Sequence, residues 1–232
     1  MEIISLGDKK PETVDEMQRQ CSDDVSFEIT DLKQGVKNPN RVNVFIDGKF
    51  LFSLDLAQVV DYKLKVGKEL SEEELEKLKK ASEFGKLYQR TLEWVLLRPR
   101  SIKETRDYLF KKIYEKKLDK HYIDEILERL EGKNYVGDLE FAKWYAENRF
   151  VKKGISKKRL EMELMKKGVA REIIEEVLNA RDDETEIQKV IAKKRKKYDD
   201  DKLIQYLCRQ GFDYQLVQNL VRNYEKDWRN SG

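Results

Sequence analysis

The chain has 232 residues, of which 39% are hydrophobic and 40% are charged, so thin helical layers suit it better than a single thick core. Residues 1–81 carry 13 Lys/Arg against 17 Asp/Glu, whereas residues 82–232 carry 35 against 28. The basic second part favours a polyanionic or acidic partner. The longest apolar run is about as short as Trp94–Leu97, which excludes a membrane-spanning helix, because such a helix needs about 20 apolar residues.

The start of the chain and its thiols indicate a cellular compartment. Met1–Lys10 holds no apolar segment of the kind that a secretory signal contains. Cys21 and Cys208 lie far apart and form no CxxC pair, so we expect buried or incidental thiols in a reducing environment. These features predict a cytoplasmic protein that makes no contact with a membrane.

The amino-terminal part divides into an arm and a small sheet. Residues 1–25 show no clean period, so we expect a loosely ordered arm. Residues 26–81 are predicted to form a β-rich subdomain with short helices, and its first strand is expected near Phe27–Lys33.

A hairpin is the strongest local signal in this subdomain. Asp47-Gly48 lies between the β-rich runs Arg41–Ile46 and Lys49–Leu54, and these two residues tolerate the positive φ angles of a two-residue turn. An uninterrupted register would set Phe45 opposite Phe50 and Val44 opposite Leu51. We expect a sheet of about three strands.

Two short helices are predicted to lead out of the sheet. Asp55 is expected to cap a helix that reaches Asp61, and Ser71 with Glu74 forms a capping box for a helix that reaches Lys80. A further helix is expected from Ser82 up to Pro99, where the proline ring ends it.

A helical repeat organises the remainder of the chain. Leu160–Leu178 recurs forty-three positions later as Leu203–Val221 with the same apolar offsets and a glycine at the same place. A more divergent copy, Ile102–Leu130, has Ile113 in place of the glycine and is about four residues longer at the turn. The predicted fold is therefore mainly α: an elongated, curved array of three tandem three-helix repeats, over residues 82–136, 137–181 and 182–232, after the small sheet.

No catalytic constellation stands out in the sequence. His121 is the single histidine and lies in a charged turn, where a solvated imidazole is expected. The acidic pairs before helices, such as Asp182-Asp183, are explained by capping and by the helix dipole. We predict no enzymatic activity, no metal site and no cofactor.

Runs of cations are the most informative feature for function. Lys193–Lys197 is an unbroken basic run, which we place on a helix, where adjacent cations repel one another unless a polyanion or an acidic surface relieves them. The alternative is a solvated helix face. The candidate contacts with a partner are Arg98, Arg100, Lys152, Lys153, Lys157, Lys158, Arg159, Lys166, Lys167, Lys193, Lys194, Arg195, Lys196 and Lys197.

These motifs resemble the RecX family of recombinase regulators. The resemblance rests on three groups of residues in the helical part: Leu97–Ser101 with Glu104, Arg106 and Leu109; Asp138–Ala142 with Arg149; and Gly154, Leu160, Glu163, Leu164 and Lys167–Val169. Arg41–Phe50, followed by Phe52–Leu54, is similar to the front end of longer members. Gly137 and Ile113 depart from the family pattern at helix boundaries.

The resemblance implies a non-enzymatic protein that binds RecA, chiefly as the nucleoprotein filament. We expect the chain to be monomeric. The resemblance further implies inhibition of strand exchange, ATP hydrolysis and coprotease activity in DNA repair, recombination and the SOS response. Weak binding to single- and double-stranded DNA is implied as well.

Two other readings of the basic helical part stay open. One is a stand-alone DNA-binding regulator that uses a helix-turn-helix pair. Glu172 and Glu175 argue against a recognition helix in the second repeat, whereas Gln215, Gln218 and Asn219 in the third are more compatible with reading bases. The other is a helical adaptor for some other protein.

Overall fold

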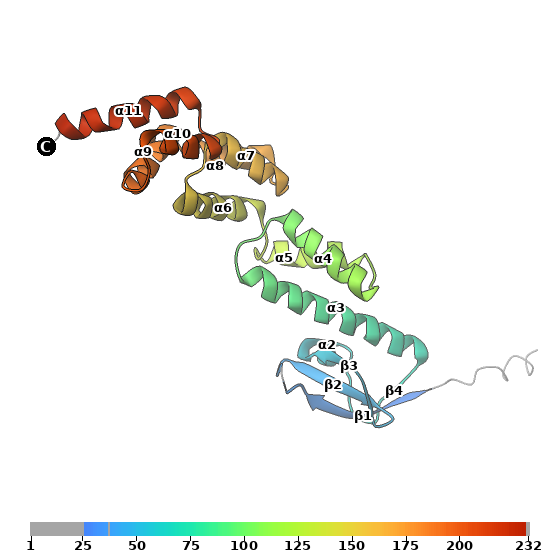
Figure 1. Cartoon of the computed structure of the whole chain (residues 1–232). Coiled ribbons are helices and arrows are strands. Elements are labelled where there is room, and N and C mark those ends of the chain that lie inside the picture. Colours follow the sequence, from blue (N-terminus) through green and yellow to red (C-terminus); the bar gives the residue numbers. More distant parts are fainter. Residues whose placement is uncertain (1–25, 37, 231–232) are drawn as a thin grey trace, which may run out of the picture. The chain divides into compact units, whose positions relative to one another are not determined.

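The computed structural model describes residues 26–36 and 38–230, without the side chains of 150–153 and 225–230 (Figure 1). The predicted arm, residues 1–25, lies outside the described residues. The chain divides into two compact units between Gly85 and Lys86. The first unit holds the sheet and the second holds the helical repeats.

A small antiparallel sheet forms the first unit. Its strands are β1 (Phe27–Gln34), β2 (Arg41–Ile46), β3 (Lys49–Asp55) and β4 (Glu69–Leu70), in the order β3-β2-β1-β4. The predicted hairpin is confirmed, with positive φ angles at both Asp47 and Gly48. The two-residue strand β4 pairs with β1 and extends the expected three strands to four.

The predicted residue pairing of the hairpin is correct beside the turn and wrong farther from it. Phe45 pairs with Phe50, but Val44 pairs with Phe52 because a bulge shifts the register between them. Leu51 was the predicted partner of Val44, and it is 42% exposed, whereas Phe52 is 3% exposed. The extra residue turns Phe52 into the core together with Val44.

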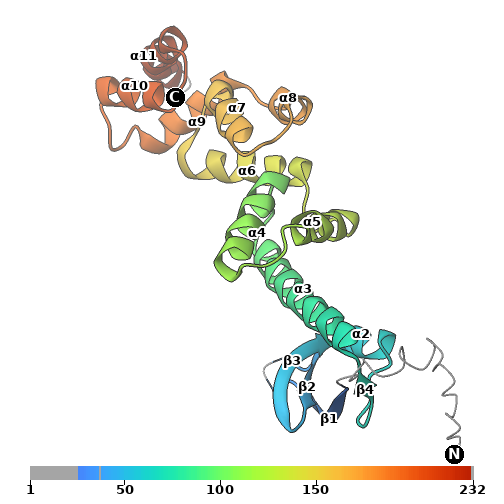
Figure 2. The same ribbon diagram turned by 90° about the vertical axis from the view of Figure 1, so that its right-hand side faces the viewer.

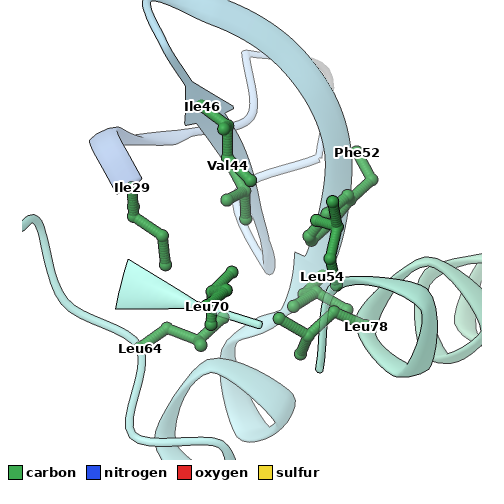
Figure 3. Close-up of a cluster of buried hydrophobic side chains, with 9 residues drawn as sticks. Ile29, Val44, Ile46, Phe52, Leu54, Leu64, Leu70 and Leu78 are labelled. Atoms are coloured by element: carbon green, nitrogen blue, oxygen red, sulfur yellow. The ribbon is translucent and has the colours of Figure 1, made fainter. Parts of the chain in front are cut away.

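The core of the first unit lies between the sheet and two helices, α2 (Leu56–Asp61) and the start of α3 (Glu72–Leu96). Figure 3 shows these side chains pointing toward one another. The buried residues that form this core are Ile29, Val44, Ile46, Phe52, Leu54, Leu64, Leu70, Leu75 and Leu78.

Helix α3 is continuous where two helices were predicted. The capping box is present, since the backbone N–H of Ser71 donates to Glu74 and that of Glu74 donates to Ser71 Oγ. The residue between Lys80 and Ser82 is an alanine, which favours a continuous helix. The Ser82 hydroxyl donates to the carbonyl of Ser53 at 2.7 Å. Because the helix is held on β3 at this point, it runs on to Leu96.

The second unit consists of three-helix repeats, as predicted (Figure 2). The latter half of α3 opens repeat 1. Repeat 1 continues with α4 (Ile102–Lys116) and α5 (Tyr122–Gly132); repeat 2 is α6 (Asp138–Lys153), α7 (Lys157–Lys166) and α8 (Arg171–Asn179); repeat 3 is α9 (Asp183–Lys194), α10 (Asp200–Arg209) and α11 (Tyr214–Asn230). Among the helices within the described ranges, none has the length and apolar content that crossing a membrane requires.

Each junction between repeats uses hydrogen-bonded contacts at the same two places. The Oδ1 atom of Asp138 accepts from the backbone N–H of Ile102, the first residue of α4, at 2.9 Å. Likewise Asp183 Oδ1 accepts from the N–H of Lys157, the first residue of α7, at 2.8 Å. Burial raises the pKa of both aspartates. The first helix of one repeat thus caps the second helix of the repeat before it.

The serine caps make the second contact. Ser101 Oγ donates to the carbonyl of Lys167, and the backbone N–H of Ser156 donates to the carbonyl of Gln210. Each serine therefore binds the turn that follows the second helix of the next repeat.

The turn glycines are required by this stacking. Gly168 has φ +81°, and a Cβ there would lie 2.7 Å from Lys103 Cβ. Gly211 has φ +93°, and its Cβ would lie 2.6 Å from Ser156 Oγ. In repeat 1 the left-handed residue is Lys117, with φ 54°, one helical turn after Ile113. Lys117 is exposed, so its side chain has room and no glycine is needed.

Candidate partner-binding surface

The first turn of α7 lacks the acidic residues that the first turns of several other helices contain. It opens with Lys157, Lys158 and Arg159 and holds no acidic residue. The first turns of α4, α9 and α10 all contain acids. Cations at a helix N-terminus oppose the helix dipole, at a cost of about 0.3–1 kcal/mol each. Such a local conflict is typical of a site that serves function rather than stability.

The three cations of this turn have different surroundings. Lys158 is exposed and Lys157 is half-buried. The Arg159 guanidinium donates to the carbonyl of Arg209 in repeat 3 and lies 3.4 Å from Glu163 Oε1. Lys166 is exposed at the other end of α7, about 12 Å from Lys158 along the helix. Arg159 therefore holds the junction, while Lys158 and Lys166 face outward.

A carboxylate inside repeat 2 orients the helices around this surface. Glu163 accepts hydrogen bonds from Arg149 at 2.5 and 2.7 Å and from the Tyr145 hydroxyl at 2.9 Å. Burial works to raise the pKa of Glu163, but the hydrogen bonds from Arg149 and Tyr145 outweigh burial and hold it below its usual value. The glutamate therefore stays ionised and fixes α6 against α7.

The predicted candidate Arg98 is part of the junction between repeats 1 and 2. Its guanidinium donates to Glu104 at 3.0 and 3.3 Å and lies 5.0 Å from the ring of Trp144. Lys167, another candidate, donates to the same Glu104 at 2.7 Å. Burial works to raise the pKa of Glu104, but Arg98 and Lys167 hold it below its usual value. Both cations thus act in stacking.

Arg100 lies in a different environment from Arg98. Its guanidinium is 3.8 Å from the centre of the Trp94 ring, which stacks on Tyr108 at 4.3 Å. Its Nε is buried and has no hydrogen-bond partner among the described residues. Burial, followed by repulsion from Arg98, lowers the pKa of Arg100. The stack holds this cation in place without neutralising it.

The basic run of repeat 3 does not lie on one helix, contrary to the prediction. Helix α9 ends at Lys194, and residues 195–197 form a turn. Lys194 Nζ lies 4.4 Å from the Tyr206 ring, and Arg195 pairs with Asp200 at 2.8 Å. The turn lets two cations pack onto repeat 3, and the side chains of Lys193, Lys196 and Lys197 remain exposed.

The exposed or half-buried cations at the two ends of α9 form two groups rather than one strip. One group, Lys157 and Lys158, lies at the start of α9 through the contact with Asp183, and the other, Lys196 and Lys197, follows the end of α9. Helix α9 has 12 residues, so its ends lie about 18 Å apart. The predicted candidates Lys152 and Lys153 have side chains outside the described residues.

Sequence reasoning missed the acids at the repeat junctions. In the sequence, Asp138 indicates only the start of a helix, Asp183 a cap and Glu104 part of a motif, while Glu186 carries no signal. The partners of the two aspartates are 36 and 26 positions away, so no local spacing reveals them. Alignment of the repeats is the signal that could have shown Asp138 and Asp183 to be equivalent.

The comparisons with known proteins agree with this architecture. Two family models match: "Regulatory protein RecX N-terminal domain" over residues 27–71, and "RecX, second three-helix domain" over residues 138–178. The first falls on the sheet, and the second covers repeat 2 from the start of α6 to Leu178 in α8.

Relatives cover most of the chain. The regulatory protein RecX of Listeria monocytogenes serotype 4a (strain HCC23) is 33% identical over 202 residues, which cover 83% of this chain and 74% of that protein. The regulatory protein RecX of Bacillus pumilus (strain SAFR-032) is 30% identical over 204 residues, covering 84% and 76%. A solved structure, "Crystal structure of regulatory protein RecX", has a TM-score of 0.61 at 20% identity and covers 85% of this chain and 99% of that chain; it supports the fold. The chain belongs to the RecX family of regulatory proteins.

Proposed function

We propose that this chain binds RecA, chiefly as the nucleoprotein filament, and inhibits strand exchange, ATP hydrolysis and coprotease activity. Its setting would be DNA repair, recombination and the SOS response in the cytoplasm. Membership of a family of regulatory proteins supports a role in regulation. The stacked repeats support a binding role, because such arrays offer an extended surface.

The first turn of α7 is the observation that carries the proposal. The first turn of α7 holds three cations and no acid of its own. Asp183 of repeat 3 lies at this helix start and Arg159 pairs with Glu163, so the electrostatic cost falls mainly on the exposed Lys158, and an anionic partner relieves it. A RecA–DNA filament presents both DNA phosphates and protein carboxylates. Attraction of this kind also speeds association.

We divide the candidate contacts with described side chains into two classes. Arg98, Arg159, Lys167, Lys194 and Arg195 each have a partner inside the second unit, so we assign them to stacking. We propose that the partner is bound directly by cations that are exposed or half-buried, or that lie on a fixed stack: Arg100, Lys157, Lys158, Lys166, Lys193, Lys196 and Lys197.

Binding to preformed filaments tests this assignment. The double variant Lys158→Gln/Lys166→Gln is titrated onto RecA filaments on single-stranded DNA, at 50 and 200 mM salt. The logarithm of the binding constant falls linearly with the logarithm of the salt concentration. Each phosphate that the variant no longer neutralises reduces the steepness of this fall by about 0.7 for a single strand. We expect weaker binding and a flatter slope.

The matched control removes the same charge elsewhere. Lys111→Gln/Lys120→Gln neutralises two exposed lysines of repeat 1 that are outside the proposed contacts. If both double variants bind with the affinity and salt slope of the unmodified chain, the surface on α7 does not contact the filament.

A second candidate function is direct recognition of DNA by α10 and α11. Gln215 and Asn219 are exposed one turn apart on α11, as polar base-reading side chains would be. Glu172, Glu175 and Glu176 on the exposed face of α8 oppose the same role for repeat 2. A gel shift with one specific and one random duplex separates the two functions, since only this candidate predicts sequence preference.

A further inference from the structure

A carboxylate in repeat 3 occupies a position that is apolar in repeat 2. Because Asp138 and Asp183 make the same contact, Glu186 in α9 corresponds to Phe141 in α6. Phe141 is fully buried, and Glu186 is 7% exposed. One turn further along α9, Val190 lies against Gly154, where an added Cβ would be 2.3 Å from the valine methyl. This face of α9 therefore points toward repeat 2.

Glu186 is incompletely paired. Its Oε1 lies 3.4 Å from Lys189 Nζ, and its Oε2 is buried without a hydrogen-bond partner among the described residues. Burial, which is the largest influence, raises the pKa of Glu186. A buried acceptor without a donor costs stability, whereas an apolar side chain at this position would not. The chain therefore keeps a destabilising group where its own repeat pattern offers a stable alternative.

An open cavity adjoins this glutamate at the junction of repeats 2 and 3. Its volume is about 410 Å³, and its walls include Glu147 from α6, Glu176 and Val177 from α8, and Glu186 from α9. Lys143 and Arg181 also line it. Lys143 lies 3.9 Å from carboxylate oxygens of Glu140 and Glu176. Three carboxylates thus face two cations around an apolar floor.

We propose that this cavity receives a lysine or arginine side chain of the protein component of the filament. The long stem of such a side chain fits against Val177. Its charged end supplies the donor that the Glu186 carboxylate lacks, provided that docking turns this carboxylate toward the cavity, because Oε2 is buried in the unbound chain. DNA is disfavoured, because the three carboxylates outnumber the two cations of the lining, and the excess negative charge repels phosphates. The inference rests on the proposed function and adds a direct contact with the RecA protein, as distinct from its DNA.

Replacement of Glu186 by an apolar residue tests the inference. Glu186→Leu restores the apolar character that repeat 2 has at this position, so its melting temperature should equal or exceed that of the unmodified chain. Its affinity for RecA filaments on single-stranded DNA should fall at least about tenfold, as when one partner of a buried charge pair is removed. Affinity for naked single-stranded DNA should not change.

Two further variants separate charge from packing. Glu186→Gln keeps the size of the side chain and removes the charge, so it should also weaken filament binding. Glu184→Gln removes a charge from an exposed position of the same helix turn and should bind as the unmodified chain does. Unchanged filament affinity in both Glu186 variants would overturn the inference and leave the proposed function standing. If the unmodified chain itself fails to bind filaments, the proposed function falls, and this inference falls with it.

Discussion

Replacement of Gly168 by alanine tests whether the repeats stack through their turns. Gly168 has φ +81°, so a side chain there costs about 1–2 kcal/mol of backbone strain. The new Cβ would also lie 2.7 and 2.8 Å from Lys103 Cβ and Cδ, and such overpacking costs about 1–3 kcal/mol more. We expect Gly168→Ala to lower the free energy of unfolding by about 3 kcal/mol.

The assay is urea unfolding followed by circular dichroism, together with a thermal scan. A loss of about 3 kcal/mol corresponds to a fall of about 6–12 °C in melting temperature for a chain of this size. Gly67→Ala is the matched control, because Gly67 has φ +80° and its Cβ would meet nothing within 4 Å. If both variants lose the same stability, the contact between the turn of repeat 2 and α4 does not exist as described.

Further predictions concern the charged groups of repeats 2 and 3. Glu163→Gln should lower the free energy of unfolding by about 2 kcal/mol in urea titrations; this is less than the 3–5 kcal/mol of a fully buried pair, because the side chain of Arg149 is 32% exposed. The pKa of Glu163 in the folded chain lies below its ordinary value of 4.5, so its pairing stabilises the fold above that pH and is lost as the pH falls through the lower folded value. Unfolding titrations between pH 7 and 3 should therefore show a shallower loss of stability in Glu163→Gln; equal slopes would contradict the assignment. Arg195→Ala should lower the melting temperature because it removes the pair with Asp200, whereas Lys196→Ala, at an exposed neighbouring position, should leave it unchanged.

Features encoded by local spacing could be predicted from the sequence. The Asp47-Gly48 turn, the Ser71 capping box and the apolar offsets of the repeat depend on residues within a few positions of one another, and the structure confirms each. The resemblance to the RecX family rested on the same short-range motifs, and the relatives confirm it.

Features that depend on distant contacts could not be predicted in the same way. The bulge at Leu51 follows from the need to bury Phe52 beside Val44, which no turn rule contains. The end of α9 at Lys194 follows from the contacts of Arg195 with Asp200 and Val221. Each of these depends on packing between elements.

The candidate site shows the same division. The cations of α7 were recognisable as a run, but their separation into stacking residues such as Arg159 and exposed residues such as Lys158 required the position of repeat 3. Glu186 gave no local signal, because an acid near a helix start is ordinarily a solvated one. Its burial, its unpaired Oε2 and its equivalence with Phe141 show it to be unusual.

The rate of ATP hydrolysis by RecA on single-stranded DNA tests the central claim most directly. The chain is added to active filaments in amounts well below the amount of RecA, and the steady-state rate is followed. A regulator that binds along the filament is predicted to lower the rate at these ratios. An unchanged rate, together with no binding to preformed filaments, would contradict the account.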